Sequence, residues 1–287
     1  MRSLLLSRLR LIPNPIKCRT ILTHSIDPPA HIPESPNSIL LLEQNLPYSF
    51  HNGISSWHET FAKHLQAKGV NYRRSDAFNP LPSTKPALPG ILATLADDIS
   101  SASDGVPSRL LLVARGPIPS LLAQYHLESL PLGGLILIDP FIFAGEDNDY
   151  GRNDAQILLN HSEDRSFDGG EVNVKSLAPT PASTEFRGEM EFLRNLSEGD
   201  IARKLKLEPG SVPVMVMWSS SFESPGVKGD AGSSNTRWEK DRVHRTADFH
   251  RDAESGTEVD LIEIDKIKDN KDAELEIIYN FLEERIF

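Results

Sequence analysis

The chain has 287 residues, and its apolar fraction of 39% is enough for one sizeable domain with a buried core. Its formal net charge of −11 repels phosphate backbones, which argues against nucleic acid as a partner. The sequence contains no run of eighteen apolar residues, so it predicts no membrane-spanning helix, and the single Cys18 excludes intramolecular disulfides and zinc sites built on paired cysteines. We predict neither a metal nor a cofactor.

The first 26 residues carry five basic residues and no acid. Leucines mix with arginines over the first twelve of them, which is typical of a basic amphipathic targeting helix. Arg8 interrupts the apolar run too early for a secretory signal. We therefore predict a mitochondrial transit peptide over residues 1–26 and a place in the mitochondrial matrix, with a plastid or the cytoplasm as alternatives. The proline-rich residues 27–37 are predicted to be an extended linker.

The rest of the chain alternates short apolar runs with segments of helical periodicity. Strands are predicted at 38–43, 70–77, 109–114, 134–139, 212–218 and 259–264. Helices are predicted at 56–68, ending near Gly69, and at 88–101, 118–129 and 270–285, with a mixed-charge, solvent-facing helix near 237–249. This order is typical of the α/β class, in which helices cover both faces of a mostly parallel sheet. Residues 141–211 interrupt the alternation, and we predict that they form a cap-like insertion.

The segment RLLLVARGPIPSLLAQYHLESLPLGGLILIDP, residues 109–140, resembles the middle of an α/β-hydrolase. In that family a strand ends in a sharp Gly-X-Ser-X-Gly turn that leads directly into a helix. The likeness extends over roughly residues 38–287, where the run at 212–218 resembles the strand before the family's catalytic acid. The run at 259–264 resembles the strand before its histidine. The resemblance implies an α/β-hydrolase-like domain over 38–287.

The residues at the places of the catalytic groups differ from those of the family. The turn reads Ala114-Arg115-Gly116-Pro117-Ile118, so Gly116 takes the place of the nucleophile and has no side chain that can attack. Pro117 takes the place whose backbone N–H helps to form the oxyanion hole, and proline has no N–H. Ile118 stands where a small residue is expected, which predicts that the tight turn does not form.

The acid and the histidine are also displaced. Glu223 is only the fifth residue after the strand at 212–218, and Asp139 is the alternative acid. No histidine occurs in residues 265–268, directly after the last predicted strand. The sequence therefore predicts a catalytically degenerate protein with a scaffold, assembly or ligand-binding role in mitochondria.

Two further hypotheses stay open. An active mitochondrial serine hydrolase of the esterase or thioesterase type would use Ser55 or one of Ser219–Ser221, with His51, His126 or His244 as the base. A small-molecule binder would use the crevice at the carboxyl ends of the parallel strands. The predicted pocket residues are Glu43, Gln44, Arg115, Gly116, Asp139 and Ser220.

Overall fold

The computed structural model describes the greater part of the predicted domain. The described residues are 24–43, 57–75, 88–140, 152–156, 192, 194–196, 198, 205–207, 210–218, 234–251, 259–263 and 271–286. Most of the predicted cap-like insertion lies outside them, as do residues 1–23 of the predicted transit peptide, 1–26, so both stay predictions.

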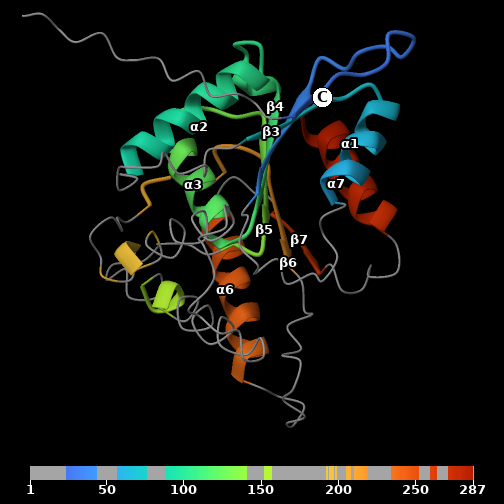
Figure 1. Ribbon diagram of the computed structural model, residues 1–287. Helices are drawn as coiled ribbons and strands as arrows, with labels where there is room; N and C mark the ends of the chain where they lie inside the picture. Colours follow the sequence, from blue (N-terminus) through green and yellow to red (C-terminus); the bar gives the residue numbers. More distant parts are fainter. Residues whose placement is uncertain are drawn as a thin grey trace, which may run out of the picture.

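Within the described residues, seven strands form one sheet in the order β1-β3-β2-β4-β5-β6-β7 (Figure 1). β1 pairs antiparallel with β3, and every other neighbouring pair is parallel. The prediction of a mostly parallel sheet is therefore confirmed. The strands are β1 (His24–Ile26), β2 (Ser38–Glu43), β3 (Asn71–Ser75), β4 (Leu110–Arg115), β5 (Gly134–Ile138), β6 (Val214–Trp218) and β7 (Asp260–Glu263).

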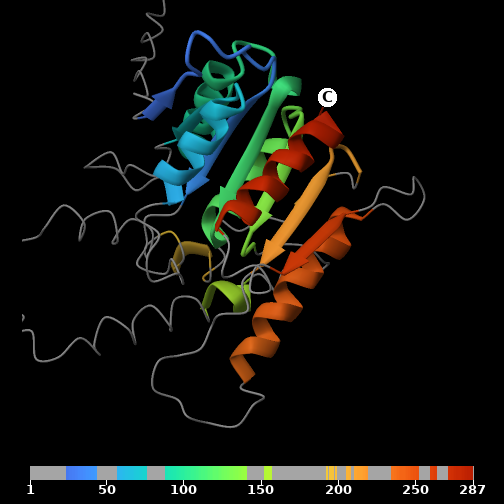
Figure 2. The same ribbon diagram turned by 90° about the vertical axis from the view of Figure 1, so that its right-hand side faces the viewer.

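Helices cover both faces of the sheet, as predicted (Figures 1 and 2). One face carries α1 (Trp57–Ala67) and α7 (Lys271–Ile286), and the other carries α2 (Leu88–Ala102), α3 (Pro117–Leu127) and α6 (Ser234–His250). Successive strand residues point to opposite faces, so the apolar runs supply two separate cores. Leu112, for example, packs with α2 and α3, whereas Val113 packs with α1 and α7.

The sequence pattern did not predict β1, whose three residues are too few to show a periodicity. It lies at one edge of the sheet, and the predicted linker that follows it contacts the end of α1. Gly69, just after α1, has a φ of +78°, and a Cβ on it would lie 2.2 Å from the carbonyl oxygen of Pro33. Glycine is therefore required here both by the backbone conformation and by this close approach.

Comparing Gly69 with Gly105 separates these two effects. Gly105 has nearly the same φ, +79°, but a Cβ there would meet no atom within 4 Å. We expect Gly105→Ala to lower the free energy of unfolding by about 1 kcal/mol through backbone strain alone. Gly69→Ala should cost at least about 1 kcal/mol more, because Pro33 must move. Urea denaturation of both variants measures the difference, and equal losses would show that Pro33 does not press on this position.

Candidate functional site

The turn between β4 and α3 consists of the single residue Gly116. Its φ of 99° and ψ of 166° belong to a region that side-chain-bearing residues rarely adopt. Its N–H donates to the carbonyl oxygen of Ile138 at 2.9 Å, which ties the turn to the end of β5. The sharp strand-to-helix turn therefore forms, and the prediction that Ile118 prevents it is wrong. Ile118 is fully buried and packs into the core between α3 and the sheet, where a large apolar side chain is accommodated.

The first turn of α3 offers few backbone donors. Pro117 and Pro119 have no N–H. The N–H of Ser120 donates to the carbonyl oxygen of Gly116 at 3.1 Å as the first bond of the helix. Of the first three residues of α3, only Ile118 has an N–H. A helix N-terminus normally attracts anions through several such groups, so this one is a poor anion site.

Two of the predicted pocket residues, Glu43 and Arg115, form an ion pair at the carboxyl ends of β2 and β4. They are register partners, and Arg115 Nη1 lies 2.6 Å from Glu43 Oε1. The other carboxylate oxygen lies 3.5 Å from Nη2 of Arg74, on β3. The side chains of Arg115 and Glu43 are only 8% and 13% exposed. This carboxylate therefore links two guanidinium groups beside the turn.

The negative charge of Glu43 also affects the pKa of a buried tyrosine, Tyr72. Tyr72, on β3, is fully buried, and burial raises the pKa of its hydroxyl. The negative charge of Glu43 raises this pKa further, and Arg74 lowers it. Tyr72 is thus held as a neutral phenol, and the charged network stays at the edge of the sheet.

Asp139, a further predicted pocket residue, lies directly after β5 with a φ of 52°. Its N–H donates to the carbonyl oxygen of Met217 at 2.9 Å. Its own carbonyl oxygen accepts a hydrogen bond from Arg242 Nη1 at 3.3 Å. The backbone of Asp139 is therefore fixed between β6 and α6, next to Ile138, which accepts the hydrogen bond from Gly116.

The prediction of a solvent-facing helix near 237–249 is wrong. α6 packs against the sheet, and Arg242 is only 3% exposed. Val243 and Ala247 lie in the core, and Arg245 pairs with the buried Asp154 at 2.9 Å. The apolar residues at 243 and 247, four apart, were the sequence signal for a buried stripe, but the surrounding charges obscured it.

Two described histidines are buried in the α3–α6 layer. His250 Nε2 lies 3.0 Å from Gln124 Oε1, and burial lowers the pKa of His250 to about 4. Burial likewise lowers the pKa of His126 to about 4. At 1.5 Å per residue, Gln124 and His126 lie roughly 12 to 15 Å along α3 from Gly116. The structure thus does not bring these imidazoles to the turn.

Of the remaining candidate residues, only His244 is among the residues that the structure describes, and it lies half-buried on α6. Within the described ranges, no group of three or more His, Cys, Asp or Glu side chains could hold a metal ion. No described helix combines the length and the apolar character that crossing a membrane requires. The candidates outside the described residues are Gln44, His51, Ser55, Ser219, Ser220, Ser221 and Glu223.

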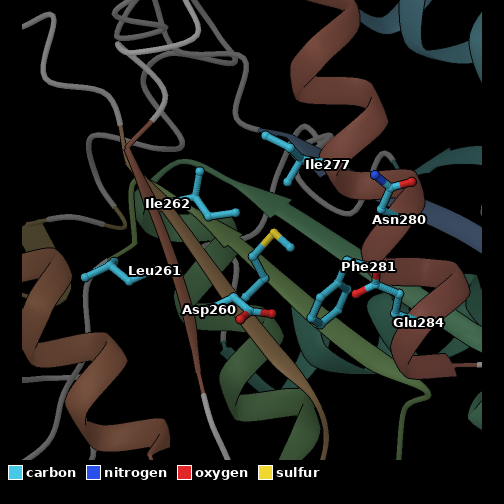
Figure 3. Close-up of a pocket in the computed structure, with 8 residues that line it drawn as sticks. Asp260, Leu261, Ile262, Ile277, Asn280, Phe281 and Glu284 are labelled. Carbon is cyan, nitrogen blue, oxygen red and sulfur yellow. The ribbon is translucent and has the colours of Figure 1, made fainter.

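A cavity of about 270 Å³ lies elsewhere, between β6, β7 and α7 (Figure 3). Its lining includes Met215 and Ile262 from the strands and Ile277 and Phe281 from the helix. It is slightly smaller than an ordinary ligand pocket, and none of the predicted pocket residues lines it. The cavity is therefore separate from the carboxyl edge of the sheet where Gly116 lies.

Comparisons with known proteins give structural likenesses only. No protein-family model and no curated protein matches the sequence. An α/β hydrolase from Sphaerobacter thermophilus is 13% identical, with a TM-score of 0.49 over 87% of this chain and 93% of that one. The esterase Est2 from Thermogutta terrifontis is 12% identical, with a TM-score of 0.49 over 91% of this chain and 88% of that one. The Vlm2 thioesterase domain is 12% identical, with a TM-score of 0.49 over 88% and 99%.

These likenesses carry no information about activity. The parallel sheet, its two helical layers and the sharp β4–α3 turn give the chain an α/β-hydrolase-like fold. Any chemistry or binding at the turn depends on the residues at the carboxyl edge of the sheet.

Proposed function

We propose that this chain is a catalytically degenerate α/β-hydrolase-like protein with a scaffold, assembly or ligand-binding role in mitochondria. The observation that carries the proposal is Gly116. The turn that would present a nucleophile is formed, but the residue at its tip has no side chain. The backbone of the site is thus kept without its attacking atom.

The oxyanion donor is missing as well. Pro117 follows Gly116 and begins α3, so the residue after the nucleophile place has no N–H. Loss of one such donor lowers turnover by about two to three orders of magnitude in enzymes that have the other groups. A second proline, Pro119, removes another donor from the same helix turn. Acyl transfer at this turn is therefore disfavoured independently of the absent side chain.

The histidines support the same conclusion. The sequence contains none after His250, which excludes a histidine between β7 and the end of the chain. His250 is bound to Gln124, and its pKa of about 4 reflects a buried neutral ring. A general base works best when its pKa lies near the working pH, so a ring with this lowered pKa is poorly suited to that role.

The buried sheet and the charged network at its edge support a binding role. Glu43, Arg74 and Arg115 join the ends of three neighbouring strands. Ligands of open α/β sheets bind at this edge, and the crevice does not require catalytic groups. The basic, acid-free N-terminal sequence supports a mitochondrial location. Fractionation of cells that express the full chain would test that location.

Labelling with a fluorophosphonate tests the absence of catalysis. We expect no labelled serine and no hydrolysis of short acyl esters above the rate without protein. The competing hypothesis is a displaced nucleophile, and Ser219–Ser221 come directly after β6 in the sequence. A labelled peptide that contains Ser55 or one of these serines would contradict the proposal. The alanine variants of the labelled position would then have to lose both the label and the turnover.

A further inference from the structure

β1 protects one edge of the sheet. It pairs antiparallel with β3, and the register partners are His24 with Arg74, Ser25 with Arg73 and Ile26 with Tyr72. The other side of β3 pairs with β2. Without β1, the outer N–H and C=O groups of β3 would form the edge of the sheet, and such an edge tends to pair with other chains.

The segment that follows β1 is also attached to the domain. Gln66 Nε2 donates to the carbonyl oxygen of Asp27 at 2.9 Å. The N–H of Ser35 donates to the carbonyl oxygen of Gly69 at 2.8 Å. Asn71 Nδ2 also donates to Glu34 Oε1. These contacts spread over residues 27–35 and reach the end of α1 and the start of β3, so the segment follows a fixed path along the domain.

We infer that residues 24–37 belong to the mature protein and that any targeting peptide ends before His24. Cleavage after residue 26 would remove all of β1, whereas cleavage at or before residue 23 leaves it complete. The cleavage part of this inference rests on the mitochondrial location in the proposed function. The structural part, the need for β1, does not.

The first test follows processing of the full chain. The precursor is imported into isolated mitochondria, and the N-terminus of the protected product is determined by mass spectrometry. We expect a product that begins no later than His24. A product that begins at residue 25 or later would overturn the inference. A precursor that is neither imported nor cut would contradict the mitochondrial location, and the second test then decides the role of β1.

The second test compares purified chains 1–287, 24–287 and 27–287. The first two should have equal Tm, and the third should melt about 5 °C lower, because it loses the β1 ladder. Amide exchange in residues 71–75 should be faster in the 27–287 chain only. Exchange in residues 134–138 of β5, in the middle of the sheet, serves as the internal control. Equal Tm and equal exchange of β3 in all three chains would overturn the inference.

Discussion

Glu43→Gln is expected to lower the free energy of unfolding by about 3 kcal/mol, the lower end of the range for breaking a buried ion pair. The carboxylate of Glu43 lies between Arg115 and Arg74, and Arg115 is 92% shielded from solvent in its side chain. Glutamine keeps the shape of the glutamate side chain but not its negative charge. The positive charges of Arg74 and Arg115 are therefore less well neutralised. The loss should appear as a lower urea midpoint with an unchanged m-value.

Two other variants distinguish the effect of burying an ion pair from the effect of forming one. Asp248→Asn breaks the Arg251–Asp248 pair, which has nearly the same distance, 2.7 Å, but is exposed on both sides. It should cost at most about 0.5 kcal/mol. Arg115→Met removes one guanidinium group and leaves the Glu43 carboxylate paired with Arg74, so it should cost less than Glu43→Gln, which removes the negative charge that both guanidinium groups face. If Glu43→Gln lowered the free energy of unfolding no more than Asp248→Asn does, the ion pairs of Glu43 with Arg74 and Arg115 would not stabilise the fold.

The main elements could be predicted because parallel strands are buried on both faces. Continuous runs such as SILLLE at 38–43 have few alternatives to a buried strand, and β2 has these bounds. β1 could not be predicted, since its position depends on pairing with β3, which lies far along the chain. The same applies to residues 27–37, where prolines indicated an extended chain but nothing local indicated its contacts.

The candidate site was predictable only in part. Gly116 and Pro117 marked the turn, because glycine and proline restrict the backbone locally. The conclusion drawn from Ile118 was wrong, since whether a large side chain fits depends on the space that α3 and the sheet leave for it. The Glu43–Arg115 pair depends on strand register, and the burial of Arg242 depends on how α6 docks. Neither can be predicted from local sequence patterns.

Stability is expected to fall steeply as the pH drops from 6.5 to 4. Burial lowers the pKa of His250 from 6.5 to about 4, so between these values the unfolded chain binds a proton that the folded chain does not. The contribution of the neutral His250 to the free energy of unfolding is therefore fully present above pH 6.5 and is lost as the pH falls towards 4. A shift of this size corresponds to about 3 kcal/mol for His250. His126, whose pKa burial lowers in the same direction, adds to the effect.

His250→Gln isolates this effect, because glutamine can still donate to Gln124 Oε1 but does not titrate in this range. We expect the variant to lose some stability at pH 7.5 and to have a shallower pH dependence between 6.5 and 4.5, measured by urea denaturation at each pH. His244→Gln makes the same chemical change at a half-buried position of the same helix and should keep the steep slope, since His126 and His250 remain. A His250→Gln slope as steep as that of the unmodified chain would mean that His250 is protonated in the folded protein, and the buried neutral ring proposed for the α3–α6 layer would be incorrect.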